Sequence, residues 1–368
     1  MNTSDFDYHL PEELIAQRSI EPRDHSRLMV VDRVSQTIQE RQFFDMLDYF
    51  RPGDVLVWNT SKVFKARLSG KLLTQNNEGL WEHKRMVEIF LVRPKENGGV
   101  WQVLGKPGKH IMNGTRVHIA DDFFGDTIIK EKNGTILMQF FSQEGLPLNE
   151  EQVRALANTY GSIPVPPYVK DEKHQLESYQ TVYAKQEGSV AAPTAGFHFT
   201  KELVDAIRAK GVEFAEVTLH VGLGTFLPVK TERIEDHTMH SEWVELNESN
   251  AYRINHAKEE GRRVIAVGTT TTRTLEGIAQ LCKQRLGEKK HGDQLLIPYT
   301  GDINIFITPG FEFHIIDGLI TNFHLPKSTL LMLVSAFMGD RAFALRCYKE
   351  AVEKEYRFFS FGDAMFIS

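Results

Sequence analysis

The hydrophobic and polar positions along the chain follow two different periods. Short runs of apolar, often β-branched residues predict buried strands, whereas apolar residues spaced three and four apart predict helices. In most of the chain these two patterns alternate, and that order predicts an α/β domain. The expected strands lie at 28–33, 55–59, 212–221, 262–268, 304–310 and 314–324, and the expected helices at 10–16, 43–50, 201–210, 249–261, 325–339 and 340–356.

Residues 68–142 have a different pattern, in which short apolar runs are separated by turn signals. Asn133-Gly134 lies between two β-rich runs and is a strong hairpin signal. Regular short strands without helical periods predict a small antiparallel β-barrel. Neither flank completes an α/β domain alone, so we expect an insertion. The predicted barrel domain is 68–155, and the predicted catalytic α/β domain is discontinuous, formed from 1–67 and 156–368.

Length and composition indicate an ordinary globular protein. The chain has 368 residues and is 41% hydrophobic, which is enough material for two domains. It has no apolar run of membrane-spanning length and does not open like a signal peptide, so we expect a cytoplasmic protein without a membrane segment. Cys282 and Cys347 are far apart, which argues against a disulfide framework or a thiolate zinc site.

Charge is distributed unevenly. The formal net charge is −6, yet residues 51–118 hold twelve Lys and Arg against five Asp and Glu, so this segment is +7 and the remainder −13. A basic segment of an acidic protein could contact nucleic-acid phosphates. It could equally be the solvated surface of the predicted barrel, and charge alone does not separate the two.

Two stretches place polar residues where a strand or loop leads into a helix. His198 comes just before Thr200, a good N-cap for the helix at 201–210. The strand at 262–268 runs into four threonines and a helix expected to begin near Arg273. Such helix starts expose backbone N–H groups to anionic or polar ligands. Taken alone, His198 could also be a packed aromatic residue between Phe197 and Phe199.

Other chemistries fit the sequence less well. His237, His240 and Glu242 form H-x-x-H-x-E, but metalloprotease histidines lie four apart on a helix, so a polar cluster at a substrate site is favoured over a metal site. No G-x-S-x-G elbow supports a serine hydrolase. Gly222 and Gly224 do not form a dinucleotide fingerprint, because Pro228 stands where the helix should begin.

The stretch AAPTAGFHFT, with YQTVYA before it, closely resembles the signature of the S-adenosylmethionine:tRNA ribosyltransferase-isomerase family of queuosine biosynthesis. The resemblance extends over nearly the whole chain in ordered blocks. Residues 60–62 depart from it, since the family usually has Asn-Asp-Thr-Arg where this chain has Asn-Thr-Ser-Lys. The further blocks include DFDYHLPEELIAQ, TLHVGLGTFLPV, HTMHSE, VGTTTTRTLE, LITNFHLPKSTLLMLVSAF and YRFFSFGDAM.

The resemblance implies a transferase and isomerase. It would move the ribosyl part of S-adenosylmethionine to prequeuosine (7-aminomethyl-7-deazaguanine) at the wobble position of a tRNA, giving epoxyqueuosine, adenine and methionine. It also implies a tRNA with a GUN anticodon, a monomer, and no metal or cofactor beyond S-adenosylmethionine as substrate. Two alternatives from other classes are a non-catalytic RNA-binding module and a metal-dependent hydrolase that uses His237 and His240.

The resemblance also selects candidate site residues. A base must take a proton from the ribose carbon beside the sulfonium. Arg273 suits the methionine carboxylate, and Glu242 or Glu276 the ammonium. The catalytic candidates are His198, His220 and His324, and the substrate-binding candidates are Asn59, Arg67, Thr194, Gly196, Gly222, Gly224, Thr225, His237, His240, Glu242, Thr270, Arg273, Glu276, Asn322 and Ser328.

For the RNA, phosphate contacts are expected from basic residues, and an extruded base needs an aromatic stacking partner. Either tyrosine named here could instead be a core residue. The candidates are Lys62, Lys65, Lys84, Arg85, Tyr168 and Tyr179, with Arg67 added to the phosphate contacts.

Overall fold

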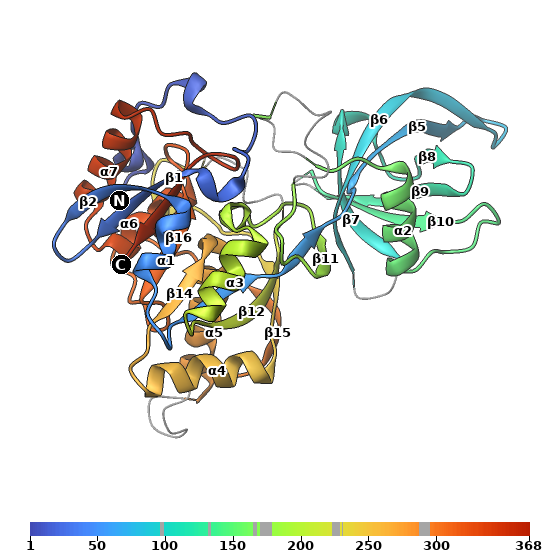
Figure 1. Ribbon diagram of the computed structural model, residues 1–368. Coiled ribbons are helices and arrows are strands. Elements are labelled where there is room, and N and C mark those ends of the chain that lie inside the picture. Colours follow the sequence, from blue (N-terminus) through green and yellow to red (C-terminus); the bar gives the residue numbers. More distant parts are fainter. Residues whose placement is uncertain are drawn as a thin grey trace. The chain divides into compact units, whose positions relative to one another are not determined.

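The computed structural model describes residues 1–95, 99–131, 134–164, 168–169, 179–222, 229, 231–286 and 295–368. The chain divides into two units. The α/β unit contains Met1–Lys62, Pro167–Gln186 and Ala192–Ser368, and the barrel unit contains Val63–Pro166 and Glu187–Ala191. Both chain ends belong to the α/β unit (Figure 1). The barrel unit is therefore an insertion into the α/β unit.

A nine-stranded mixed sheet forms the centre of the α/β unit (Figure 1). Four neighbouring strands, β12, β3, β14 and β16, run parallel. All five residues of β3, VLVWN, are buried, as expected of a strand covered on both faces. The order across the sheet is β15 (Tyr299–Ile303), β13 (Glu242–Leu246), β12 (Glu213–His220), β3 (Val55–Asn59), β14 (Val264–Val267), β16 (Gly318–Asn322), β17 (Ala364–Ile367), β1 (Arg27–Asp32) and β2 (Thr37–Gln42).

Four helices of this unit begin at polar caps that the sequence provides. Thr200, Asn247, Ser328 and Asp340 each accept a hydrogen bond from the backbone N–H three residues later, at 3.2, 2.9, 3.2 and 3.1 Å. The helices are α1 (Met46–Tyr49), α3 (Lys201–Ala209), α4 (Glu248–Glu259), α5 (Gly268–Leu286), α6 (Thr329–Met338) and α7 (Arg341–Glu353). Among the described residues, no helix combines the length and apolar character that crossing a membrane requires.

The core of the α/β unit is built from the two predicted periods. On α3, Leu203 and Ile207 are four apart and face the sheet, where they join Leu56 and Ile265 in one buried cluster. Burying a side chain of this size contributes about 1.5–3 kcal/mol. Trp58 belongs to the same cluster and stacks on a tyrosine ring at 4.0 Å. This packing holds the end of β3 against the segment that precedes His198.

The barrel unit contains a closed six-stranded antiparallel barrel, as predicted (Figure 1). The buried positions alternate along β5 and β10, so one face of each strand fills the barrel interior. Of the predicted hairpin, Asn133 lies outside the described residues. The order is β10 (Ile136–Phe141), β7 (Val100–Lys106), β6 (Trp81–Pro94), β5 (Arg67–Gln75), β8 (Arg116–Ala120) and β9 (Phe123–Lys130), and α2 (Glu150–Tyr160) belongs to the same unit. Two short strands, β4 (Ser61–Val63) and β11 (Gln186–Ser189), pair separately.

Several predicted elements differ in the structure. The strand expected at 304–310 is absent; Ile305 and Ile307 are buried there without a paired strand, and Pro309-Gly310 turns the chain. The helix expected at 10–16 is a single 3-10 turn, η2 (Glu12–Leu14), and that at 43–50 is divided into η4 (Phe43–Asp45) and α1. The apolar residues at 304–310 therefore indicated burial, but they did not indicate whether the segment pairs as a strand.

The start of α5 was predicted too late. The helix begins at Gly268 and includes the four threonines. Thr271, Thr272 and Thr274 donate side-chain hydrogen bonds to the carbonyl oxygens four residues earlier, at 2.7, 3.2 and 2.9 Å. These bonds satisfy the hydroxyl groups inside the helix, so β-branched residues that favour other conformations are tolerated there.

Candidate active site

The parallel strands end together at one edge of the sheet, which we call the carboxyl edge. Asn59 and His220 are the last residues of β3 and β12, Gly268 follows β14 directly, and Asn322 is the last residue of β16. In α/β sheets, ligands usually bind at this edge. Four segments that are distant in the sequence thus meet where a site is expected.

Hydrogen bonds connect these segments. Thr194 Oγ1 donates to Asn322 Oδ1 at 3.1 Å, and Asn59 Nδ2 donates to Thr270 Oγ1 at 3.4 Å. Nε2 of His198 lies 3.0 Å from Asn322 Nδ2. We call Asn59, Thr194, His198, Thr270 and Asn322 the polar cluster. Its members come from β3, η6 (Thr194–His198), α5 and β16, so the tertiary fold creates it.

His198 is the most constrained member of the polar cluster. Its side chain is buried, with Nδ1 2.7 Å from Ser26 Oγ and Nε2 3.0 Å from Asn322 Nδ2. The imidazole stacks on the Phe43 ring at a centroid distance of 4.9 Å. Polar contacts at both nitrogens and an aromatic ring on one face fix the orientation of this histidine.

The partners also determine its tautomer. An amide nitrogen only donates, so Asn322 Nδ2 donates to Nε2, and Oδ1 of the same amide accepts from Thr194. Nε2 therefore carries the lone pair. Nδ1 carries the proton and donates to Ser26 Oγ.

The surroundings favour the neutral imidazole. Burial, with smaller effects from the positive charges of Arg23 and Arg357, lowers the pKa of His198 from 6.5 to about 3. His198 is thus neutral at physiological pH. It has a lone pair available in principle, but it is a weak base in this state.

The other two candidate histidines lie in different surroundings. His324 is buried, its Nε2 lies 2.8 Å from Thr321 Oγ1, its backbone N–H donates to Tyr348, and burial lowers its pKa to about 3. These contacts indicate that His324 has a structural role in connecting core elements. His220, at the end of β12, stacks on Trp243 at 5.0 Å and lies at the carboxyl edge.

Arg273 and Glu242 form a buried ion pair beside the carboxyl edge. Glu242 also accepts from the backbone N–H of Gly222 at 3.4 Å. Among the described residues, Nε and Nη2 of Arg273 are buried and have no hydrogen-bond acceptor. Because an unsatisfied buried donor costs free energy, these two N–H groups are suited to donate hydrogen bonds to an anionic ligand group.

Two further substrate-binding candidates serve the protein itself. Glu276 is fully buried and accepts backbone N–H bonds from His314, Ile315 and Ile316 at 2.9, 3.0 and 3.1 Å; burial raises the pKa of its carboxyl. Its oxygens are thus already occupied by a loop. Ser328 is the N-cap of α6.

Of the glycine candidates, the structure describes Gly196 and Gly222. A Cβ at Gly196 would lie 1.9 Å from the Tyr183 hydroxyl oxygen, so η6 needs glycine there to pack closely. Gly222 is half-buried beside Glu242. The remaining candidates of this stretch, Gly224 and Thr225, lie outside the described residues.

His237 and His240 do not join a metal-type cluster in the described part of the chain, where no group of three or more His, Cys, Asp or Glu side chains is close enough to hold an ion. The ring of His237 packs edge-on against Phe306 at 5.4 Å. Burial and His240 lower its pKa. His240 is exposed.

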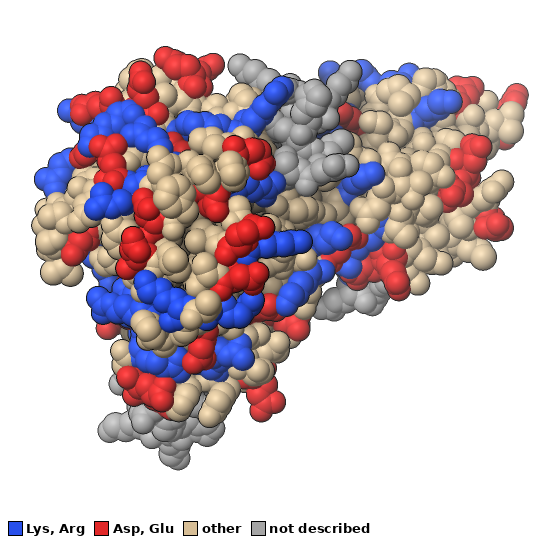
Figure 2. All heavy atoms as spheres, in the orientation of Figure 1, with Lys and Arg blue, Asp and Glu red and all other residues tan. Residues whose placement is uncertain are grey.

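The basic candidates are divided between the two units. Lys62 ends the first segment of the α/β unit and is exposed; Lys65 and Arg67 are half-buried in the barrel unit. Lys84 and Arg85 are exposed on β6, and Lys84 Nζ lies 2.9 Å from an exposed glutamate. On the face shown in Figure 2, basic and acidic side chains of the barrel unit are interspersed and do not form one basic surface.

The two candidate stacking tyrosines belong to the core of the α/β unit. The Tyr179 ring is fully buried against Phe197 and Phe361, so no base could reach its face in this conformation. Tyr168 is half-buried, packs on Phe359 at 4.2 Å, and its hydroxyl contacts Ser360. The structure gives Tyr179 a packing role instead of the predicted stacking role.

Sequence reasoning missed several residues around His198. Ser26, Phe43, Arg23 and Arg357 all act on this imidazole through contact or charge. Ser26 is 172 positions from His198, and no local pattern joins them. The one available signal was the block YRFFSFGDAM, which contains Arg357 and resembles the family.

Comparisons with known proteins agree over the full length. The family model described as "Queuosine biosynthesis protein" matches residues 3–367. A relative from Carboxydothermus hydrogenoformans is 49% identical over 368 residues and one from Thermotoga petrophila 47% identical over 367, each covering all of both chains; both are named S-adenosylmethionine:tRNA ribosyltransferase-isomerase. A crystal structure of the S-adenosylmethionine tRNA ribosyltransferase from Thermotoga maritima matches with a TM-score of 0.53 and 38% identity, covering 99% of this chain and 100% of that one.

An α/β unit with a polar cluster at the carboxyl edge of its sheet, interrupted by a small β-barrel, defines the class as a two-unit α/β enzyme. The full-length match then identifies the family. The chain belongs to the queuosine biosynthesis family of S-adenosylmethionine:tRNA ribosyltransferase-isomerases. This membership favours the predicted enzyme over the RNA-binding module and the metal-dependent hydrolase.

Proposed function

We propose that the protein transfers and isomerises the ribosyl moiety of S-adenosylmethionine onto prequeuosine at the wobble position of a tRNA with a GUN anticodon. The products are epoxyqueuosine in the tRNA, adenine and methionine. One observation carries this proposal: relatives named for this reaction are 47% and 49% identical to the chain from end to end. The polar cluster at the carboxyl edge supports it, because its groups suit the steps of the reaction.

The first step needs a base. A proton leaves the ribose carbon that is bonded to sulfur, and its electron pair stays on a carbon that the positive sulfonium stabilises. Adenine then leaves with a proton as its glycosidic bond breaks, methionine leaves as the carbon–sulfur bond breaks, and the amino group of prequeuosine forms the new bond to the ribosyl carbons. The positive sulfur lowers the basicity that the protein must supply.

We assign the base to His198. Its Nε2 carries the lone pair, and the Asn322 amide now donates to that atom at 3.0 Å. The reacting carbon must therefore displace this hydrogen bond. Ser26 holds the opposite nitrogen at 2.7 Å and would keep the ring in place while Nε2 exchanges partners. His220, at the same edge, is a second candidate for proton transfer to adenine.

The methionine end of the substrate is assigned to Arg273 and Glu242. The charges of these two side chains balance each other, as do the two charges of an amino-acid zwitterion. The Arg273 Nε and Nη2 donors, which lack acceptors among the described residues, would bind the carboxylate, and Glu242 would bind the ammonium. Glu276 is less suited to the ammonium, because three backbone N–H groups already occupy it.

The tRNA is assigned to the predicted barrel domain, residues 68–155, through exposed cations such as Lys84 and Arg85. The proposal further includes a monomeric protein in the cytoplasm that needs no metal and no cofactor beyond S-adenosylmethionine.

The test is to incubate the purified protein with S-adenosylmethionine and prequeuosine-containing tRNA and to measure free adenine by chromatography. We expect adenine only when both substrates are present. Binding of the tRNA without adenine release would contradict the proposal and would favour the RNA-binding module.

A further inference from the structure

Residues 357–363 lie between α7 and β17 and form a loop that has no part in the assignments above. Its own hydrogen bonds close it. The backbone N–H of Asp363 donates to the Arg357 carbonyl oxygen at 2.8 Å, and Oδ2 of Asp363 accepts the backbone N–H of Arg357 at 2.8 Å. A Cβ at Gly362 would lie 2.4 Å from that carbonyl oxygen, so this tight turn needs glycine. We call this segment the 357–363 loop.

The second oxygen of Asp363 connects this loop to the contacts of His198. Oδ1 accepts the backbone N–H of Arg27 at 2.9 Å. The preceding residue is Ser26, whose hydroxyl lies 2.7 Å from Nδ1 of the imidazole. The carbonyl oxygen of Ser26 accepts the backbone N–H of Phe43 at 2.8 Å, and the Phe43 ring stacks on the imidazole. One bond from Asp363 therefore fixes the backbone next to the residue that holds Nδ1.

The same loop makes two more contacts around the imidazole. The backbone N–H of Phe359 donates to the carbonyl oxygen of Phe323 at 3.0 Å, and this residue directly follows Asn322, the partner of Nε2. The Phe361 ring stacks on the ring of Phe197, which directly precedes the histidine, at a centroid distance of 5.8 Å. The loop therefore contacts the residue next to the histidine and the residue next to each of its two hydrogen-bond partners.

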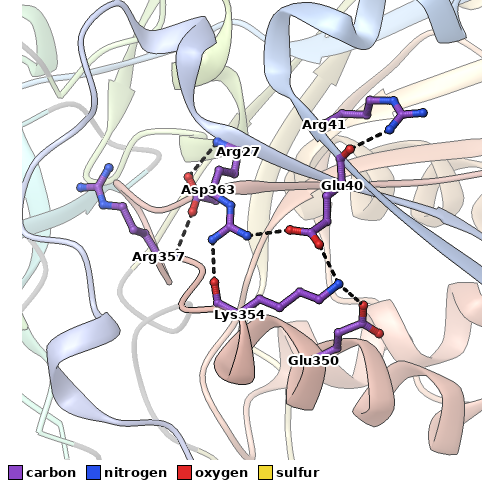
Figure 3. Close-up of polar contacts among 7 residues, drawn as sticks. All are labelled: Arg27, Glu40, Arg41, Glu350, Lys354, Arg357 and Asp363. Atoms are coloured by element: carbon purple, nitrogen blue, oxygen red, sulfur yellow. Dashed lines mark hydrogen bonds and ion pairs between the residues drawn. The ribbon is translucent and has the colours of Figure 1, made fainter.

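The charged side chains near Asp363 are paired with one another at the surface. Arg27 Nη2 and Lys354 Nζ both bind the carboxylate of Glu40, at 2.8 and 2.7 Å. Figure 3 shows that the Asp363 carboxylate lies apart from these pairs and faces backbone N–H groups. The side chains of Arg27 and Glu40 are 31% and 42% exposed, so water screens their pair. The buried bond from Asp363 is therefore the stronger restraint on this backbone.

Asp363 is fully buried. Burial raises the pKa of its carboxyl, whereas the backbone N–H groups of Arg357 and Arg27 favour the charged form. Each carboxylate oxygen accepts one of these two N–H groups. Replacing either oxygen by a donor would leave a buried N–H group without an acceptor, which is costly.

We infer that Asp363 is a positioning residue of the reaction, which holds Ser26 so that its hydroxyl keeps the His198 ring aimed at the substrate. The inference rests on the proposed function, in which His198 is the base. Nε2 must exchange the Asn322 amide for the reacting carbon, and Ser26 holds the ring during that exchange. A small misplacement of a reacting group slows the chemical step. Asp363 thus acts through Ser26 and contacts no substrate.

The first experiment measures the kinetics of Asp363→Asn. An amide has one acceptor oxygen and one donor nitrogen, so one of the two backbone N–H groups loses its acceptor, and either the loop or its link to Arg27 opens. We expect kcat for adenine release to fall about tenfold. The KM for S-adenosylmethionine and the affinity for the tRNA should stay at the wild-type values, because the groups assigned to binding are unchanged.

The second experiment observes the ring directly by NMR of isotope-labelled histidine. The signal of the His198 Nδ1 proton is identified by its loss in His198→Ala. In Ser26→Ala this proton has no hydroxyl acceptor, which gives the reference shift for the released ring. We expect Asp363→Asn to move the His198 signal toward this reference and to leave the His324 signals unchanged. A general loosening of the fold would move the signals of both buried histidines.

Asp54→Asn is the matched control. Asp54 is also a buried aspartate whose Oδ2 accepts a backbone N–H, that of Arg51 at 2.7 Å, and it lies just before β3, at the opposite edge of the sheet. This variant should lose stability and keep the wild-type kcat and His198 signal. If Asp363→Asn does not fold, Asp363→Glu, which displaces both oxygens by one methylene, is measured in its place, with the same changes expected.

Three results would overturn the inference. The first is a wild-type kcat with an unmoved His198 signal in folded Asp363→Asn. The second is equal movement of the His198 and His324 signals. The third is a full loss of kcat when Asp363→Asn is added to Ser26→Ala, because a residue that acts through Ser26 has little effect once that hydroxyl is gone. If the wild type releases no adenine, the proposed function fails, and the NMR signals still decide whether Asp363 positions the ring.

Discussion

His198 is held by side chains from distant parts of the chain, Ser26 and Asn322, and these contacts define which nitrogen can take a proton. We expect His198→Ala to lower turnover by at least about a hundredfold, the usual range for lost acid–base catalysis. tRNA affinity should stay nearly intact. Single-turnover adenine release and RNA titration measure the two effects separately.

The control for this variant is His256→Ala. His256 is half-buried on α4, where it lies 3.6 and 3.3 Å from two surface glutamates. It should turn over like the wild type. Wild-type turnover in His198→Ala itself would remove this residue from the mechanism.

The buried histidines also predict a pH dependence of stability. The pKa values of His198 and His324 fall from 6.5 in the unfolded chain to about 3 in the fold, so the unfolded chain binds more protons between these pH values. Stability therefore decreases as pH falls through this window. By pH 5, each histidine should cost about 2 kcal/mol of unfolding free energy.

Urea unfolding at pH 7 and pH 5 measures this cost. In His324→Gln, the loss of stability between the two pH values should be about 2 kcal/mol smaller than in the wild type, because one of the two titrating groups is gone. An equal loss in both proteins would show that His324 is not buried in its neutral form.

Among individual residues, His198, Asn322 and Arg273 could be predicted as site residues, because each lies in a sequence motif that resembles the family. They could not find Ser26 or the cationic surroundings of His198. Those contacts depend on how η6 packs against segments more than a hundred positions away, and no local period encodes such a distance.

At the scale of elements, the carboxyl and amino ends of β14 carry two arginine–carboxylate pairs with different expected roles. Arg273, in the helix that follows β14, pairs with Glu242, whereas Arg263, just before β14, pairs with Asp54 at 3.0 Å through Nε. We expect Arg273→Lys to raise the KM for S-adenosylmethionine about tenfold, since lysine lacks the fork that binds a carboxylate. Initial rates at saturating tRNA measure this.

Arg263→Lys is the matched control, as it makes the same change at the opposite edge of the sheet. It should cost some stability and leave the KM unchanged. Equal KM values for S-adenosylmethionine in Arg273→Lys and wild type would move the amino-acid subsite away from this pair.

The long periodic elements were predictable, and short or unpaired ones were not. α3, α7 and the strands of the parallel core follow their sequence periods closely. The start of α5 was missed because threonine hydroxyls bond back to carbonyls and allow a helix where β-branched residues argue against one. The strand predicted at 304–310 was wrong, since Ile305 is buried there without strand pairing.

At the scale of the whole molecule, the sequence predicted an α/β domain formed from both chain ends and an inserted barrel, and the structure has this organisation. That prediction rested on the change near residue 68 from alternating strand and helix patterns to short apolar runs separated by turn signals. The structure extends the barrel unit to Val63 and Pro166. The flanking segments had no signal of their own, because their membership depends on tertiary contacts.

The basic side chains of the barrel unit lead to a prediction about RNA. Reversing both exposed cations, Lys84→Glu with Arg85→Glu, should weaken tRNA binding and make the affinity less dependent on salt. Binding titrations over a range of salt concentrations measure both quantities. Arg208→Glu with Lys349→Glu, which reverses two exposed cations of the α/β unit, is the control and should bind like the wild type. An unchanged salt slope in the barrel variant would place the RNA contact elsewhere.

In the proposed reaction, the ribose of S-adenosylmethionine becomes part of the RNA. The most direct measurement uses two preparations of S-adenosylmethionine, one labelled in the ribose carbons and one in the methyl group, each incubated with prequeuosine-containing tRNA. We expect the ribose label to enter the RNA, with one adenine released per modified nucleotide, and the methyl label to leave with methionine. Methyl label in the RNA, or adenine release without ribose label in the RNA, would contradict it.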